Sequence, residues 1–255
     1  MCIRDSFTYE LFLDDQGQKI SKSSGNGISI DEWLTYASPE SLSYFMYQKP
    51  KTAKRLHFDV IPKAVDEYHQ QLRAYGTQDL KSKAANPIFH IHGNTAPNSD
   101  MVVPFSMLLN LAAVANAEDK DQLWGFIKRY AKDASPENNP QLDQAASFAI
   151  SYYNDFVKPK KVYRLPNTTE KEALMDLHSM LSDFKGNRDA EELQSIVFAC
   201  GREKFDPLRE WFTALYEVLL GASQGPRFGG FIALYGIEET IQLIEKALNG
   251  VFVKD

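Results

Sequence analysis

The sequence predicts a mainly α-helical protein, and three observations lead to this prediction. Apolar side chains recur with the three- and four-residue spacing of a helix through most of the chain after Pro104. The 255 residues are 44% hydrophobic and 12% aromatic, which is enough apolar material for one large core or two modest cores. Helix starts that combine a polar capping side chain with a following proline occur at Ser38-Pro39-Glu40, Ser135-Pro136-Glu137 and Asp206-Pro207.

One strand is predicted near the start of the chain. Residues 7–13 are rich in aromatic and apolar side chains, and Asp14, Asp15 and Gly17 follow as a turn. A strand needs a neighbour, and only six residues precede this one. It therefore either pairs with a segment further along the chain or belongs to a sheet that this chain does not contain, and we expect the second arrangement.

The rest of the first part is predicted as helices and loops. Helical patterns cover residues 31–36, 39–48 and 58–75. Residues 77–100 are less regular and are expected to join two domains. Within them, residues 88–93 are predicted to form a short strand or an extended packing segment.

The predicted helices of the second part carry apolar faces. Residues 105–115 are apolar nearly all round, which is typical of a helix buried on several sides. Thr169 and Glu172 fit a capping box at the start of another helix. Further apolar stripes of helical spacing lie at residues 123–130, 142–156, 208–219 and 237–248. We therefore predict an all-α bundle or cage.

Composition limits the partners and the compartment. The 28 Lys and Arg residues against 34 Asp and Glu residues give a formal charge of -6, so contact with a nucleic acid depends on local basic patches. Cys2 and Cys200 suit neither a disulfide framework nor a paired-cysteine zinc site. The sequence has neither the ~20 consecutive apolar residues of a membrane span nor an apolar signal segment. We expect a cytoplasmic protein without membrane or DNA partners.

A polar loop follows the predicted strand. It consists of Lys19-Ile20-Ser21-Lys22-Ser23 and then Ser24-Gly25-Asn26-Gly27, and it leads into an amphipathic helix. Lysine, serine and glycine are also typical of solvated linkers, so the first five residues alone leave that alternative open. Together, the strand before the loop, its residues and the helix after it resemble the signature loop of class I aminoacyl-tRNA synthetases.

The resemblance implies a role in ATP chemistry for this loop. Activation of an amino acid by ATP develops negative charge on the departing pyrophosphate, which positioned cations and hydrogen-bond donors stabilise. In the family the second lysine is the main contact to the phosphates, and here it is Lys22. The resemblance thus implies Lys19 and Lys22 as catalytic residues, and Lys19, Ser21, Lys22 and Ser23 as the ATP-binding set. Mg²⁺ is expected only as the counter-ion of ATP, and no metal site on the protein is predicted.

Longer runs of residues resemble class I lysyl-tRNA synthetases in particular. They lie at 31–42, 45–50, 53–62, 110–111, 116–119, 225–229 and 231–236. The resemblance covers nearly the whole chain from Phe7 onward and implies ATP, L-lysine and the lysine tRNA as substrates. Composition and spacing alone would not select lysine, and a glutamyl-type specificity stays open as an alternative.

The resemblance also implies three parts. Residues 1–30 correspond to the end of a Rossmann catalytic domain with its last strand and signature loop. Residues 31–95 correspond to a small helical region that contacts the tRNA stem, and residues 96–255 to a helical cage that binds the anticodon. The helical second part predicted from periodicity agrees with such a cage.

One departure from the family pattern is large. The family's other signature, a His-x-Gly-His motif near the start of the nucleotide domain, does not occur, because His90-Ile91-His92-Gly93 lies after the signature loop. We interpret these histidines as packing or supporting groups rather than metal ligands. The chain is therefore expected to be a C-terminal fragment without the lysine pocket, inactive in isolation, with residues 1–6 foreign to the family.

Two basic clusters are candidate RNA contacts. The first comprises Lys49, Lys51, Lys54 and Arg55 and lies where the family's stem-contacting region is expected. The second lies at residues 158–164. Ordinary solvated residues at loop boundaries are the alternative for both clusters.

Candidate contacts to RNA bases lie near the end of the chain. Anticodon bases are recognised unstacked, on aromatic or arginine planes, so Arg227 and Phe228 in a glycine-rich segment are candidates. A tight helix connection is the alternative for this segment. We predict that the chain is the signature-loop and tRNA-binding part of a class I lysyl-tRNA synthetase. A stand-alone tRNA-binding or protein-interaction module without catalysis is the alternative.

Overall fold

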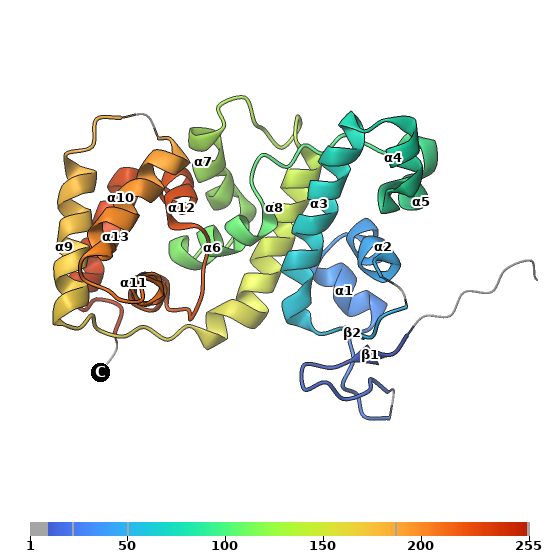
Figure 1. Cartoon of the computed structure of the whole chain (residues 1–255), viewed down its shortest axis with the longest axis horizontal. Coiled ribbons are helices and arrows are strands. Elements are labelled where there is room, and N and C mark those ends of the chain that lie inside the picture. The colour runs from blue at the N-terminus through green and yellow to red at the C-terminus, as the bar shows by residue number, and fades with distance from the viewer. Residues whose placement is uncertain (1–9, 22, 50, 187, 254–255) are drawn as a thin grey trace, which may run out of the picture. The chain divides into compact units, whose positions relative to one another are not determined.

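The chain folds mainly into helices. The computed structural model describes residues 10–21, 23–49, 51–186 and 188–253. The chain divides into two compact units, of which the first ends at Ser106 and the second begins at Met107. Helices make up most of each unit (Figure 1). The prediction of a mainly α protein is confirmed.

The first unit contains a short parallel sheet and five helices among its described residues. The elements are β1 Phe12–Leu13, α1 Ile30–Tyr36, α2 Pro39–Tyr47, β2 Lys54–Arg55, α3 Ile61–Thr77, α4 Leu80–Ala85 and α5 Pro87–His92, with single 3-10 turns at Phe58–Val60 and Gly93–Thr95.

The predicted strand has a partner further along the chain, so our preferred expectation for it was wrong. β1 pairs with β2 in parallel, with Phe12 beside Lys54 and Leu13 beside Arg55. Parallel strands need a crossover of a dozen or more residues, and α1 and α2 supply it here. Residues 7–9 of the predicted strand lie outside the described part of the chain.

Side-chain caps fix the starts of the first two helices. Ser29 and Glu32 form a reciprocal capping box at α1, with bonds of 3.2 Å from the Glu32 amide and 2.7 Å to the Glu32 carboxylate. Ser38 caps α2 as predicted, because its hydroxyl accepts a 3.3 Å bond from the Ser41 amide. The buried Trp33 then bonds the Ser41 hydroxyl at 3.3 Å and ties the two helices together.

Residues 88–93 are largely helical, and the prediction of a strand or extended segment for them was wrong. α5 begins at Pro87, and the Asn86 side chain accepts a 3.0 Å hydrogen bond from the Ile88 amide. An asparagine cap before a proline is a strong helix start. A short apolar run cannot by itself distinguish a strand from a buried helix, which explains the error.

All regular elements among the described residues of the second unit are helices. α6 Phe105–Ala115 begins with the last two residues of the first unit and has the bounds predicted from sequence. The other helices are α7 Lys120–Tyr130, α8 Pro140–Tyr152, α9 Thr168–Ser182, α10 Ala190–Arg202, α11 Arg209–Leu215, α12 Phe228–Tyr235 and α13 Ile237–Leu248, with π-helical continuations at Tyr153–Val157 and Tyr216–Leu220 and a 3-10 turn at Lys158–Lys160.

Two details of this unit differ from the prediction. The capping box of α9 consists of Asn167 and Glu170, two residues before the predicted pair, with bonds of 2.9 and 2.8 Å. On α7, Leu123, Trp124 and Ile127 are buried whereas Tyr130 is 45% exposed, so the apolar stripe predicted at residues 123–130 is buried only in part. The Trp124 indole buries a large ring and also donates a 3.0 Å bond to Asp143.

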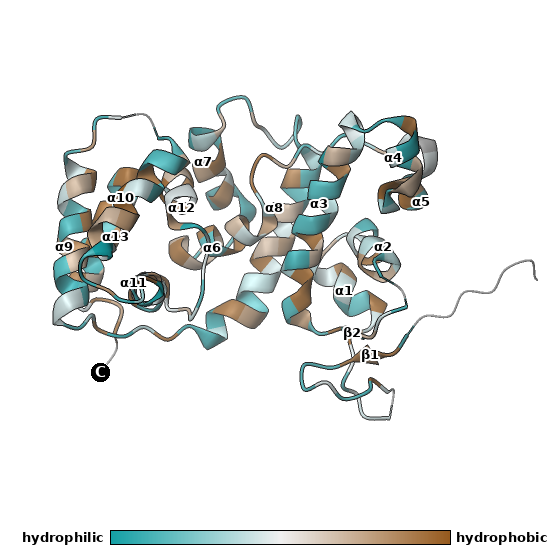
Figure 2. Ribbon diagram, in the orientation of Figure 1, coloured by the Kyte–Doolittle hydropathy of each residue, from teal (hydrophilic) through white to brown (hydrophobic). Residues whose placement is uncertain are grey.

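The core of the second unit depends on close helix packing. Trp211, Phe228 and Phe231 are fully buried. α10 packs closely against α12, because a Cβ atom placed on Gly229 would lie 2.3 Å from the carbonyl oxygen of Ala190. Figure 2 shows both hydrophilic and hydrophobic residues on α9 and α13, as expected for helices with one buried face. Among the described residues, no helix combines the length and the apolar character that crossing a membrane would require.

Candidate active-site loop and nucleic-acid interface

The signature loop is anchored by a buried carboxylate directly after β1. Asp14 is only 8% exposed. One of its oxygens accepts bonds from the amides of Gln16 and Gln18 at 3.0 and 2.7 Å. The other accepts a 2.7 Å bond from the side-chain amide of Asn26, at the far end of the loop. Asp14 therefore holds both ends of the loop together.

These hydrogen bonds also fix the charge of the carboxylate. The bond from the Asn26 amide is the main cause that lowers the pKa of Asp14 below its usual value, and the amides of Gln18, Gln16 and Gly17 add to it. Burial acts in the opposite direction but is outweighed. Asp14 is thus ionised at neutral pH and can keep the loop closed there.

Backbone contacts and two glycines shape the loop between its ends. Lys19 forms an antiparallel bridge with Leu13, and its side chain is exposed. Gly25 adopts a φ of +60°, which favours glycine. A Cβ atom on Gly27 would lie 2.3 Å from Cγ2 of Ile20, so a larger residue would displace the centre of the motif.

The serines of the motif form a hydroxyl cluster. The Ser21 hydroxyl lies 2.6 Å from that of Ser24 and 3.2 Å from that of Ser23. Asn26 accepts a 3.1 Å bond from the Ser21 amide, which connects the cluster to the Asp14 anchor. Lys22 lies outside the described residues, so its predicted role stays a prediction.

The first basic cluster contains one structural lysine and three exposed cations. The Lys54 ammonium donates to the carbonyls of Phe45 and Met46 at 2.5 and 3.2 Å, and thereby closes the C-terminal end of α2. Burial lowers the pKa of Lys54 below its usual value. The side chains of the other members are exposed on the surface: Lys49, Lys51 and Arg55.

The β1–β2 pairing brings this cluster beside the base of the signature loop. Arg55 pairs with Leu13, the residue before the Asp14 anchor, and the Leu56 amide donates a 2.7 Å bond to the Leu13 carbonyl. The two segments are about 40 residues apart in sequence. The sequence analysis did not bring the loop and the cluster together, because two-residue strands are too short for their pairing to be predicted.

The two candidate base contacts have different environments. Arg227 is exposed and forms a bidentate ion pair with Glu191, one arm of which measures 2.6 Å. Phe228 is fully buried in the core of the second unit, against Phe231 and Tyr216. No face of the Phe228 ring is open to a base in this structure, so we carry only Arg227 forward.

Two residues of the second basic cluster, Lys161 and Arg164, have internal partners. Lys161 donates a 2.6 Å bond to the carbonyl of Ala113 near the end of α6, and burial lowers its pKa to about 8. Arg164 bonds Glu170 through two nitrogens at 2.6 and 2.8 Å and Glu217 through a third at 2.6 Å. These contacts favour a structural role for both residues over contact with RNA.

The two histidines of α5 pack against tyrosines of neighbouring helices. His92 Nε2 lies 2.9 Å from the Tyr68 hydroxyl, and the His90 ring stacks on Tyr47 with 4.9 Å between ring centroids. This agrees with their interpretation as packing groups. Sequence spacing gave no indication of which rings they contact.

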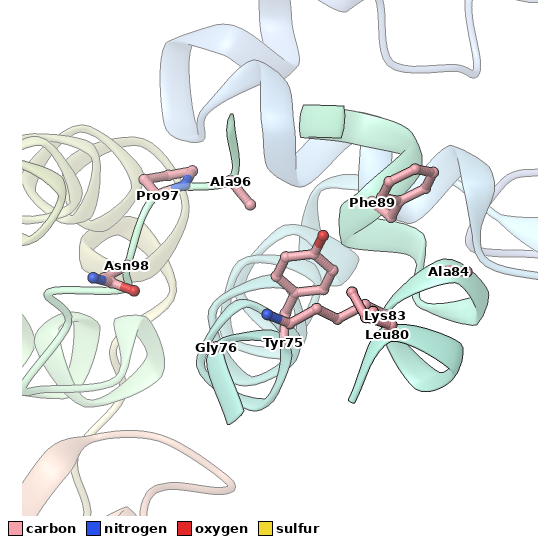
Figure 3. A pocket seen from close by; sticks show the side chains of 9 residues that line it. All are labelled: Tyr75, Gly76, Leu80, Lys83, Ala84, Phe89, Ala96, Pro97 and Asn98. Atoms are coloured by element: carbon pink, nitrogen blue, oxygen red, sulfur yellow. The ribbon is translucent and has the colours of Figure 1, made fainter. Parts of the chain in front are cut away.

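A cavity of about 350 Å³ lies between α3, α4, α5 and the segment that follows α5 (Figure 3). The ammonium of Lys83 sits 5.1 Å from the centroid of the Tyr75 ring inside it. No sequence motif indicated this cavity. Its lining residues are Tyr75, Gly76, Leu80, Lys83, Ala84, Phe89, Ala96, Pro97 and Asn98.

Comparison with known proteins supports the resemblance found in the sequence. Residues 5–95 match the family model described as tRNA synthetases class I (K). The chain is 71% identical to the lysine–tRNA ligase of Roseobacter denitrificans over 251 residues, which are 98% of this chain and 48% of the relative. It is 49% identical to the lysine–tRNA ligase of Rickettsia conorii over 243 residues, 94% of this chain and 47% of the relative.

A third relative gives the same picture. The lysine–tRNA ligase of Rickettsia bellii is 50% identical over 243 residues, which are 94% of this chain and 47% of the relative. The chain thus spans about half the length of the curated relatives it matches. By sequence, the chain belongs to the family of class I lysine–tRNA ligases.

Proposed function

We propose that this chain is the signature-loop and tRNA-binding part of an enzyme that activates L-lysine with ATP and transfers it to the lysine tRNA. The identity of 71% to a lysine–tRNA ligase across 98% of the chain carries this proposal. The anchored loop after β1 supports it, because its position and residues agree with the family signature. A cytoplasmic location accompanies the proposal, since tRNA charging supplies protein synthesis.

The donors of the loop fit the phosphates of ATP. Lys19 is exposed, and the hydroxyls of Ser21, Ser23 and Ser24 cluster beside it in a loop shaped by glycines. We propose that Lys19 and Lys22 hold the phosphates and stabilise the charge of the departing pyrophosphate, with Mg²⁺ as the counter-ion of ATP. Losing one such donor costs roughly 2.7 to 4 kcal/mol of transition-state stabilisation.

The tRNA is proposed to contact exposed cations in both units. In the first unit these are Lys49, Lys51 and Arg55, within the proposed stem-contacting region 31–95. Lys54 contributes mainly by holding this segment against α2. In the proposed anticodon-binding region 96–255, Arg227 is the candidate base contact. Local patches are needed because the whole chain carries a formal charge of -6.

A chimera tests this function directly. The matching stretch of the Roseobacter denitrificans ligase is replaced by this chain, and charging of lysine tRNA is measured. We expect the chimera to charge this tRNA, because the two stretches are 71% identical. In the chimera, Lys22→Ala should lower kcat by roughly 10²- to 10³-fold, and Lys19→Ala should act in the same direction.

The control is Lys81→Ala, which removes an exposed cation of α4 outside the loop and the basic cluster. It should leave kcat unchanged. A folded chimera that does not charge lysine tRNA would contradict the proposed function. An unchanged kcat in the Lys22→Ala chimera would contradict the role of the loop.

A further inference from the structure

An exposed pair of stacked rings lies on the first unit, and the proposed function does not use it. The rings of Tyr47 and His90 lie 4.9 Å apart between centroids and are inclined by 21°, which is a stacked geometry. Tyr47 is 39% exposed, and His90 is also exposed. Packing within the fold therefore leaves part of the pair's aromatic surface open to solvent.

Both rings of the pair belong to helices whose ends are fixed by hydrogen bonds. Tyr47 is the last residue of α2, whose C-terminal carbonyls are bonded by the Lys54 ammonium at 2.5 and 3.2 Å. His90 lies on α5, which the Asn86 cap fixes at its start and which packs against α2. The ring pair is therefore presented by two capped helices rather than by a loose loop.

Two cations follow Tyr47 closely along the chain. Lys49 and Lys51 come two and four residues after Tyr47, and both are exposed. Lys49 adopts a φ of +44° and accepts a 3.1 Å bond from the Thr52 amide, so the segment turns tightly here. The same segment continues into β2, which pairs with β1 at the base of the signature loop.

We propose that Tyr47 and His90 form a stacking platform for one unstacked base of RNA, with the adjoining phosphates bound by Lys49 and Lys51. The proposal rests on the proposed function, which supplies tRNA as the partner. Every base has a π-face, so an exposed ring pair with cations on the adjoining segment can bind single-stranded nucleotides with little sequence preference. The segment that carries both lysines continues into β2, which pairs with β1 before the signature loop, and from this continuity we infer the acceptor end of the tRNA as the source of the base.

RNA suits the platform better than a free nucleotide does. The rings and the lysines lie on an exposed surface, whereas sites for small ligands are concave and enclose most of the ligand. A polynucleotide bound elsewhere along its length needs only a stacking plane and backbone cations at such a point. Binding of adenosine monophosphate tests the alternative that the platform binds a free nucleotide.

Binding of lysine tRNA to the purified 255-residue chain tests the platform. Tyr47→Ala and His90→Ala should each weaken binding by about tenfold, which is within the effect of losing one base–aromatic stack. Tyr47→Phe should bind as the unchanged chain does, because it keeps the ring. Lys51→Ala should reduce the dependence of log Kd on log salt concentration by about one unit, as expected for one lost phosphate contact.

Two controls separate the platform from general effects. Tyr130→Ala removes a comparably exposed tyrosine, 45% against 39%, from the second unit and should leave binding unchanged. Circular dichroism and thermal unfolding of each variant show that the loss of affinity does not come from unfolding.

The outcomes distinguish this inference from the proposed function. Tight binding by the unchanged chain, with equal affinity in the folded Tyr47→Ala and His90→Ala variants, would overturn the platform and leave the proposed function standing. Absence of tRNA binding by the unchanged chain would overturn both. Binding of adenosine monophosphate that Tyr47→Ala abolishes, without any change in tRNA affinity, would overturn the assignment to RNA.

Discussion

At the scale of single residues, the first unit contains a histidine that is kept neutral. His69 on α3 is 8% exposed, and its Nδ1 atom lies 3.4 Å from the Ser99 hydroxyl. Burial is the main cause that lowers the pKa of His69 to about 4, and the neighbouring Arg73 lowers it further. Protonation of this ring is therefore coupled to unfolding.

The sign of the resulting pH dependence follows from linkage. Between about pH 6.5 and pH 4 the unfolded chain binds a proton at His69 and the folded chain does not, so the free energy of unfolding falls as pH decreases through this window. Above about pH 6.5, the contribution of His69 to the free energy of unfolding is constant. Across the whole window, the pKa shift of His69 changes the free energy of unfolding by about 3 kcal/mol.

Urea unfolding at several pH values checks this prediction. The difference in unfolding free energy between the unchanged chain and His69→Gln should change steadily from pH 6.5 to pH 4, because glutamine does not titrate. Contributions from the carboxylates cancel in that difference. Parallel pH curves for the two proteins would contradict the buried neutral state of His69.

Residues of the candidate site were proposed from the sequence, but their partners in the fold were not. The lysines and serines of the signature loop were proposed through the family resemblance that their order carries, and their roles stay a prediction. The Asp14 anchor was not predicted, because its partner Asn26 lies twelve residues away and no pattern marks the contact. Lys54 and Phe228 were chosen for their chemistry, yet folding uses the first as a helix cap and buries the second.

At the scale of elements, the crossing of α10 and α12 depends on one glycine. A Cβ atom on Gly229 would lie 2.3 Å from the Ala190 carbonyl oxygen and 2.4 Å from the Gln194 amide nitrogen. Both are backbone atoms, so neither can rotate away. Gly229→Ala should therefore lower the free energy of unfolding by about 1 to 3 kcal/mol, or more if α12 shifts.

The adjacent glycine provides a matched control in the same helix. A Cβ atom on Gly230 would meet only the flexible end of the Met107 side chain, at 3.4 Å. Gly230→Ala should be neutral or raise stability by about 0.5 to 1 kcal/mol, because alanine favours the helix. Thermal unfolding of both variants measures the two changes in stability. Equal destabilisation by the two substitutions would mean that α10 and α12 do not pack this closely at Gly229.

The elements that were predicted well are those with long periodic patterns or clear caps. α6 and α2 follow the prediction closely, since one is a run of eleven residues that is apolar nearly all round and the other has the Ser38 cap before Pro39. α5 and the β1–β2 pair were missed because each is too short to show a period. Their positions depend on tertiary contacts, which sequence patterns do not contain.

At the scale of the whole molecule, the proposed tRNA contacts lie in both units. The first unit carries the signature loop and the exposed cations of the basic cluster, and the second is a helical unit with Arg227 on its surface. The chain is acidic overall, so binding to a polyanion must come from these local groups. Such binding is selective only if the surface recognises more than charge.

The most direct test of the central claim is the affinity of the purified chain for lysine tRNA and for a non-cognate tRNA, measured at two salt concentrations. We expect tighter binding to lysine tRNA at both concentrations, and weaker binding of each tRNA at the higher one, because phosphate contacts release counter-ions. Equal affinity for the two tRNAs, or absence of binding by a folded sample, would contradict the claim that this chain is the tRNA-binding part of a lysine–tRNA ligase.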